Sequence, residues 1–105
     1  MIGVLTFLRA RPDRLAQLID ALQDVIAPSR GNPNCVAMHL HADRGDACRL
    51  MIYEQWQSKT DFDVNGALPQ FQWLWQHRME FLENDIDTYF FDLVSAAPPA
   101  DAAIR

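Results

Sequence analysis

The stretch Arg-Leu-Met-Ile-Tyr-Glu-Gln-Trp, residues 49–56, carries apolar side chains at odd and even positions alike. In a β-strand successive side chains point to opposite faces, so Leu50, Ile52 and Trp56 would lie on one face and Met51 and Tyr53 on the other. A strand with one solvated face normally alternates apolar and polar residues. The pattern therefore predicts a sheet that is apolar on both faces.

Outward from this strand, the chain predicts the element order β-α-β-β-α-β. Strands are expected over residues 2–9, 35–41, 49–56 and 86–95. An amphipathic helix follows Pro12 and ends at the breakers that begin at Pro28, a short helix starts at the Ser58 cap and ends near 65–66, and a further helix runs from 68–69 to 82. This order is the ferredoxin-like α+β fold, with a four-stranded antiparallel sheet and helices on one face.

Two helices cover only one face of such a sheet. The other face would carry roughly eight apolar side chains that expose about 800 Å², more than soluble monomers usually show. We therefore expect a homodimer that forms through the sheet face. A length of 105 residues fits one domain, which we place at residues 1–95. Residues 96–105 form a C-terminal tail that is hypothesised to lie on another subunit.

Composition and charge exclude several functions. The net charge of −5 and the dispersed Lys and Arg residues argue against a nucleic-acid partner. The N-terminal residues do not form a signal peptide, and no apolar run approaches the roughly 20 residues that span a bilayer. We expect a cytoplasmic protein with no membrane association. Cys35 and Cys48 are expected to be free thiols, because a hairpin turning near Gly45 places them far apart.

Motifs for bound cofactors and metals are lacking in the sequence. The four glycines stand alone, outside any phosphate-binding pattern. His39 and His41 form an H-x-H pair, but no nearby residue completes a metal site, so they are read more simply as solvated strand histidines. His77 is a lone helical histidine, for which we consider a surface role or a role as proton shuttle. We expect no cofactor and no metal.

The most unusual residue is Glu54, an acid between Ile52 and Trp56 on a strand face that should be core. Burial would raise its pKa unless an arginine pairs with it, and such carboxylates are often functional. The alternative is a structural ion pair or hydrogen bond. Nearby aromatic residues could line an apolar pocket for a flat aromatic ligand, or could simply be core; they are Trp56, Phe62, Phe71 and Trp75.

Residues 54–58 (Glu-Gln-Trp-Gln-Ser), followed by Asp61-Phe62 and by residues 68–71 (Leu-Pro-Gln-Phe), resemble the antibiotic biosynthesis monooxygenase (ABM) family. Family members typically show E-x-W-x-S, then a hydrophobic residue, a His, and P-H-F. The resemblance spans about residues 2–95 and includes Asn34-Cys35, where the family commonly has Gly-Cys. It implies a dimeric α+β barrel.

The resemblance also implies an oxidoreductase that oxidises quinols or polycyclic phenols with O₂ and without flavin, haem or metal. Trp56 and Glu54 match the tryptophan and glutamate of the family. Asn65 and Gln70 replace two family histidines, so a general base is not obvious. The haem-degrading branch fits less well, because its helical His falls at Trp75 and its pocket Trp near Val64.

The leading hypothesis is a cofactor-independent monooxygenase-like enzyme acting on a small aromatic or quinol substrate. Its catalytic residues would be Glu54, Trp56 and Asn65, and its substrate-binding residues would be Phe62, Phe71, Trp75 and His77. A second hypothesis is a non-enzymatic dimeric ligand-binding or stress-associated protein on the same fold. A third, an isomerase or lyase for small organic acids, requires Arg9 or Arg78 to point into the pocket.

Overall fold

The computed structural model describes residues 1–95. The predicted tail at residues 96–105, with its hypothesised contact to another subunit, lies outside them. The elements are β1 (Ile2–Arg9), α1 (Leu15–Arg30), β2 (Cys35–Ala42), β3 (Arg49–Trp56), α2 (Lys59–Gly66), α3 (Pro69–His77) and β4 (Asp87–Asp92), with one-turn 3₁₀ helices η1 (Pro12–Arg14) and η2 (Arg78–Glu80).

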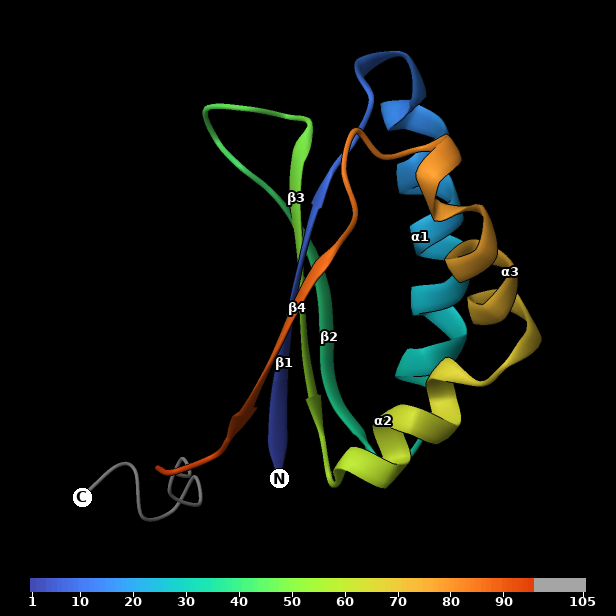
Figure 1. Ribbon diagram of the computed structural model, residues 1–105. Helices are drawn as coiled ribbons and strands as arrows, with labels where there is room; N and C mark the ends of the chain where they lie inside the picture. The colour runs from blue at the N-terminus through green and yellow to red at the C-terminus, as the bar shows by residue number, and fades with distance from the viewer. Residues whose placement is uncertain (96–105) are drawn as a thin grey trace.

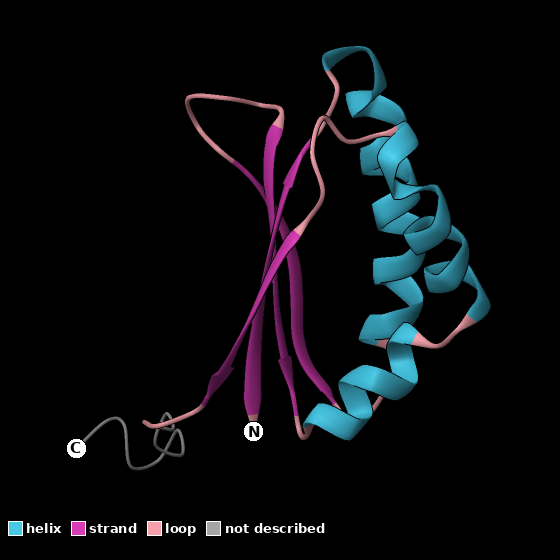
Figure 2. Cartoon of the chain, viewed as in Figure 1, coloured by secondary structure: helices cyan, strands magenta, loops and turns pink. Residues whose placement is uncertain are grey.

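The four strands form one antiparallel sheet in the order β2-β3-β1-β4. Helices α1, α2 and α3 all lie on the same side of this sheet, which gives two layers (Figures 1 and 2). The order of elements and the sheet order together confirm the predicted ferredoxin-like α+β fold. β3 and β1 are the central strands, so the stretch that predicted the fold lies in the middle of the sheet.

The hydrophobic core fills the space between the sheet and the helices. The helix-facing positions of β1 alternate with those of the other face, so Val4 and Leu8 are buried while Leu5 and Phe7 are only partly buried. Further buried residues of the sheet are Met38, Leu50 and Trp56. Helix α1 contributes its buried apolar side chains, Leu18, Leu22, Val25 and Ile26. This core holds the helices at a fixed position above Glu54.

The other face of the sheet has no helix on it within residues 1–95 (Figure 1). Leu5 of β1 pairs with Tyr53 of β3 on one side and with Tyr89 of β4 on the other. The neighbouring positions on the same face are Phe7, Met51 and Phe91, and Tyr89 and Phe91 are about half exposed, at 51% and 53%. Both faces of the sheet are therefore apolar, as the sequence predicts.

Helix α1 runs through Pro28 and ends at Arg30, within the stretch of breakers at residues 28–34 where it was predicted to stop. Proline lacks an N–H and removes one helical hydrogen bond, but this loss falls in the last turn. The Ser29 hydroxyl donates to the Val25 carbonyl at 2.7 Å, and Gly31 N–H donates to the Pro28 carbonyl at 3.1 Å. These bonds keep the last turn helical.

Helix α3 and strand β4 are shorter than predicted. The chain leaves α3 after His77, and Leu82 forms an isolated antiparallel bridge with Ala10, which extends β1. Strand β4 ends at Asp92 because that residue pairs with Ile2, the first residue of β1. At the opposite edge of the sheet, the register of β2 shifts between Cys35 and Ala37, so Val36 forms a bulge.

Candidate functional site

Glu54 lies on the helix-facing side of β3 and is only 7% exposed. Its Oε1 accepts a hydrogen bond from Trp56 Nε1 at 3.0 Å. Burial raises the pKa of Glu54 to about 7, and the Trp56 hydrogen bond opposes that rise only in part. Within residues 1–95 no basic side chain forms a salt bridge with Glu54, so the predicted alternative of a structural ion pair is not formed.

The neighbours of Glu54 in the sheet explain this pKa. Val4 of β1 and Met38 of β2 pair with Glu54 on either side, and both are buried apolar residues. Cys35 pairs with Trp56, and its thiol pKa is raised by burial first and by the Glu54 charge second. Cys35 and Cys48 are both free thiols, as predicted. The carboxyl group thus lies among groups that cannot solvate its charge.

Aromatic rings lie beside the Glu54–Trp56 pair. Trp56 is fully buried, and the Phe62 ring of α2 contacts it edge to face with centroids 6.5 Å apart. Phe90 of β4 packs on Phe62 in the same way at 5.3 Å, and Lys59 Nζ lies 5.0 Å from the centre of the Phe90 ring. Phe71 packs against the core from α3. Phe90 was not among the aromatic residues that the sequence indicated for the site.

Asn65 lies on α2 one turn after Phe62 and is 3% exposed. Its Nδ2 donates to Ser29 Oγ of α1 at 3.0 Å. The Ser58 cap positions α2, since Ser58 Oγ accepts from Asp61 N–H at 3.1 Å, which confirms the predicted helix start. Ser29 was missed in the sequence, because it lies among the residues that were read as helix breakers.

Two oxygen atoms of this group have no hydrogen-bond partner within residues 1–95: Glu54 Oε2 and Asn65 Oδ1. In the same residues, every side-chain nitrogen or oxygen atom that is completely closed off from solvent has a hydrogen-bond partner. Both oxygens must therefore reach space that is open to water or to a ligand, although each residue is more than nine-tenths buried. The structure thus places two hydrogen-bonding oxygens at the boundary of an aromatic core.

Trp75 and His77 lie apart from this group. Trp75 is 48% exposed, so it is not part of the core, which was one of the two readings from the sequence. Its ring lies under the Arg78 guanidinium at 3.8 Å, and Arg78 also holds the pKa of the Asp85 carboxyl down at about 2. His77 stacks on Trp73 with centroids 4.5 Å apart and hydrogen-bonds Glu80. Trp75 lies inside α3 next to the buried Leu74, so the outward position of its ring reflects its packing on Arg78.

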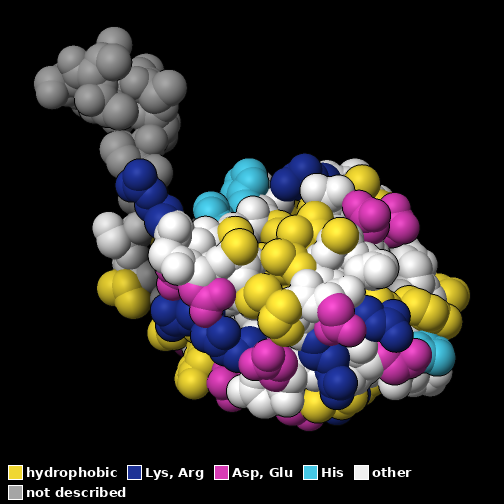
Figure 3. All heavy atoms as spheres, turned by 90° about the horizontal axis from the view of Figure 1, so that it is seen from above, with side chains coloured by type: hydrophobic (Ala, Val, Ile, Leu, Met, Phe, Trp, Pro, Cys, Tyr) yellow, Lys and Arg dark blue, Asp and Glu magenta, His cyan; other side chains and the backbone are white. Residues whose placement is uncertain are grey.

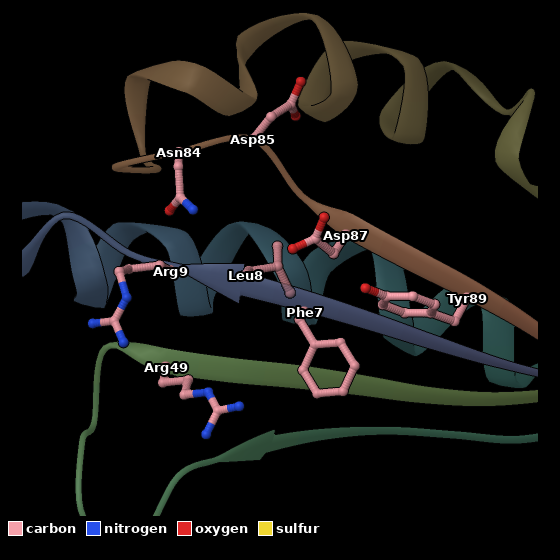
Figure 4. Close-up of a pocket in the computed structure, with 8 residues that line it drawn as sticks. All are labelled: Phe7, Leu8, Arg9, Arg49, Asn84, Asp85, Asp87 and Tyr89. Carbon is pink, nitrogen blue, oxygen red and sulfur yellow. The ribbon is translucent and has the colours of Figure 1, made fainter.

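A hollow of about 390 Å³ lies at the end of the sheet near the β2–β3 loop (Figure 4), lined by Phe7, Leu8, Arg9, Arg49, Asn84, Asp85, Asp87 and Tyr89. Arg9 pairs with Asp46 at 2.9 Å and Arg49 pairs with Asp43 at 3.1 Å, so neither guanidinium is free for an anion. Figure 3 views this end of the molecule, where basic and acidic side chains lie interspersed.

The arginines that the third hypothesis requires are engaged elsewhere. Arg9 forms the ion pair with Asp46, and Arg78 forms a double hydrogen bond with Asp85 at 2.7 and 3.0 Å. Both carboxylate partners are substantially exposed. Neither guanidinium is bonded to Glu54 or Asn65, so the isomerase or lyase hypothesis gains no support from the geometry.

Metal and membrane sites were also considered. Within residues 1–95 no three His, Cys, Asp or Glu side chains are grouped to hold a metal ion, and the His39 and His41 rings lie 6.3 Å apart. No helix in this part of the chain is long and apolar enough to cross a membrane.

Solved structures share the fold of this chain. Rv0793 from Mycobacterium tuberculosis matches with a TM-score of 0.85 and 20% identity, over 92% of this chain and 98% of that one. PA3566 from Pseudomonas aeruginosa matches with a TM-score of 0.81 and 21% identity, over 90% and 94%. A crystal structure described as an antibiotic biosynthesis monooxygenase matches with a TM-score of 0.83 and 20% identity, over 90% and 100%. At these identities the similarity establishes a ferredoxin-like α+β domain.

The sequence identifies the family. The model of the antibiotic biosynthesis monooxygenase family matches residues 1–73, which include β1 to β3, α1, α2, Glu54, Trp56 and Asn65. The chain therefore belongs to the antibiotic biosynthesis monooxygenase family. No curated protein matches it.

Proposed function

We propose that the protein is a cofactor-independent monooxygenase-like enzyme that acts on a small aromatic or quinol substrate, with Glu54 as its general base. The observation that carries the proposal is a buried carboxyl group whose pKa is raised to about 7 and whose Oε2 has no hydrogen-bond partner in the part of the chain that the structure describes. A base works best when its pKa lies near the operating pH. In this proposal Glu54 serves as the general base in place of the two family histidines that Asn65 and Gln70 replace.

The chemistry needs proton removal and a sheltered anion. The Glu54 carboxylate takes the proton of a phenolic hydroxyl, and the resulting anion gives electrons to O₂. One oxygen atom enters the ring as a carbonyl oxygen, and the other leaves as water with the hydrogens lost from O–H and C–H. Phe62 and Phe90, whose rings pack edge to face at 5.3 Å, would keep water from the anion. Asn65 would hold the hydroxyl in place.

We also propose that two copies pair through the open face of the sheet and form a dimeric α+β barrel. The support is the apolar face at Leu5, Phe7, Met51, Tyr53, Tyr89 and Phe91, over which no helix lies in residues 1–95. Apolar patches of this kind mark interaction sites on soluble proteins. A partner on this face would bury it and leave the Glu54 face under its own helices.

One observation favours the alternative, a non-enzymatic ligand-binding protein on the same fold. Trp56 is completely buried and its N–H is used by Glu54, so the tryptophan offers a ligand neither ring face nor donor. Such a protein would bind the aromatic ligand beside Phe62 without consuming O₂.

An oxygen electrode with a panel of quinols and polycyclic phenols tests the enzymatic proposal. We expect O₂ uptake that rises through about pH 7 as Glu54 loses its proton and then levels off. Glu54→Gln should reduce kcat/KM by about 100-fold or more, whereas the exposed control Glu83→Gln should leave it unchanged. Absence of turnover with every compound, or full activity in Glu54→Gln, contradicts the proposal. Binding without turnover, measured by calorimetry, would instead support the ligand-binding alternative.

A further inference from the structure

Ser29 connects the site to helix α1. It lies in the last turn of that helix, is 1% exposed, and hydrogen-bonds to two groups. Its hydroxyl donates to the Val25 carbonyl at 2.7 Å, and it lies 3.0 Å from Asn65 Nδ2. No part of the proposed reaction uses Ser29, so its burial beside Asn65 requires another explanation.

The single proton of Ser29 decides which way the Asn65 amide points. A carbonyl oxygen can only accept, so the hydroxyl proton must go to Val25. The Ser29 oxygen is then left with acceptor capacity only, and its second partner must be a donor. The NH₂ group of Asn65 meets that demand and the amide oxygen does not, so a flipped amide would place two oxygen atoms in contact without a proton between them.

This orientation leaves the Asn65 carbonyl oxygen as an acceptor that has no hydrogen-bond partner within residues 1–95 and is not completely closed off from solvent. Asn65 lies one turn from Phe62 on α2, and the Phe62 ring contacts Trp56, the partner of Glu54. Helix α2 therefore carries one acceptor of fixed orientation one turn away from an aromatic ring of the candidate site.

We propose that Ser29 is a positioning residue that holds the Asn65 amide with Oδ1 toward the ligand, so that the site selects aromatic ligands that present a hydroxyl proton. The inference rests on the proposed function in one respect, namely that an aromatic ligand binds beside Glu54 and Asn65. It extends that function by stating which form of the substrate is recognised. A phenol or quinol can donate to Oδ1, whereas an ether or a quinone of the same shape cannot.

Calorimetry with 1-naphthol and 1-methoxynaphthalene tests this selectivity, because the two probes share the ring system while the ether replaces the hydroxyl donor by a methoxy group. The change of their affinity ratio between wild type and Ser29→Ala cancels the constant contribution of the added methyl group. In the full-length protein we expect 1-naphthol to bind about tenfold more tightly, as one hydrogen bond to a buried acceptor allows. Ser29→Ala should bring the ratio of the two dissociation constants below about threefold, and Ser29→Thr, which keeps the hydroxyl, should restore it. A purely structural role would weaken both probes alike. An unchanged ratio in Ser29→Ala overturns the inference.

A second readout separates failure of this inference from failure of the proposed function. In ¹⁵N-labelled protein without ligand, the Asn65 side-chain NH₂ protons should exchange with water about tenfold faster in Ser29→Ala than in the wild type, since they lose their acceptor. Ser29→Thr should keep the slow exchange, and Ser29→Cys serves if the threonine does not fold. If neither probe binds, the proposed ligand class is wrong, and this exchange measurement still decides the role of Ser29. Equal exchange in wild type and Ser29→Ala overturns that role.

Discussion

The two faces of the sheet carry similar side chains but differ in what covers them. The helix-facing side buries Val4, Leu50 and Trp56 under α1, α2 and α3, whereas the opposite side presents Tyr53 and Tyr89 with no helix above them. The helix-facing side also contains one buried carboxyl group, Glu54, with no charged partner in residues 1–95. Apolar composition alone therefore does not distinguish a buried face of the sheet from an open one. A single buried polar group, however, can mark a candidate functional site.

The largest expected effect comes from Trp56, because it is the largest fully buried side chain on the helix-facing side. Trp56→Ala should lower the free energy of unfolding by about 4 kcal/mol through lost burial and a cavity. Urea denaturation measures the change. Trp56→Phe is the milder comparison, since it keeps one aromatic ring while it loses the N–H bonded to Glu54 and part of the buried volume. If Trp56→Ala costs no more than an exposed substitution, the contrast between the faces is wrong.

The pH dependence of stability sharpens the same contrast. Because the pKa of Glu54 is about 7 in the folded protein and about 4.5 when unfolded, the folded state holds the proton more tightly. Stability from this group is fully present below pH 4.5 and is lost as the pH rises to 7, by up to about 3 kcal/mol.

Chemical denaturation at pH 4.5, 6 and 8 tests this expectation. Glu54→Gln removes the titrating group, so its stability should fall less over this range than that of the wild type. Asp87→Asn changes an exposed acid on the open side of the sheet and should follow the wild type. Parallel curves for the wild type and Glu54→Gln would mean that Glu54 is solvated.

The open face is tested by placing a charge at its centre. Tyr53→Asp should weaken the proposed homodimer by at least about 100-fold, or about 3 kcal/mol, because an unpaired charge would be buried against the partner. Sedimentation equilibrium should then give the 12.0 kDa chain in place of a mass twice as large. Gln23→Asp, on the exposed side of α1, is the control. A wild type that sediments as a monomer at all concentrations would refute the pairing.

The smallest effect is expected at Trp75, which lies on the outer surface of α3. Its ring contacts the Arg78 guanidinium at 3.8 Å and is 48% exposed. Trp75→Ala should lower the free energy of unfolding by less than about 1 kcal/mol and leave the affinity for 1-naphthol unchanged. Thermal unfolding and calorimetry check both expectations. A loss of ligand affinity would return Trp75 to the binding site that the sequence suggested.

Most of the fold prediction rested on the alternation of apolar side chains between the two faces of each strand. Side chains alternate strictly between two faces, so the residues on each side of β3 could be assigned once the strand was recognised. The unusual position of Glu54 followed from the same alternation. The identity of its neighbours could not be predicted, because Val4 and Met38 lie in strands that are distant in sequence.

Local rules failed where tertiary contacts outweighed them. The breaker cluster located the end of α1 correctly, but it gave no sign that Ser29 is helical and buried, because the hydroxyl bond in the last turn is not visible in a residue pattern. The sequence also placed Trp75 with the pocket residues Trp56, Phe62 and Phe71. In the structure Trp75 is 48% exposed and packs on the Arg78 guanidinium, although its neighbour Leu74 is buried.

The bulge at Val36 also bears on how the molecule can assemble. Edge strands present unpaired backbone groups to other sheets, and bulges and charged residues discourage that contact. Here the bulge interrupts the β2 edge, and Asp87 and Asp92 begin and end the β4 edge. Contact between edges can repeat without limit, whereas contact between two identical faces is closed by twofold symmetry after one partner. The features of both edges thus discourage open-ended assembly, and this agrees with the proposed pairing through the open face.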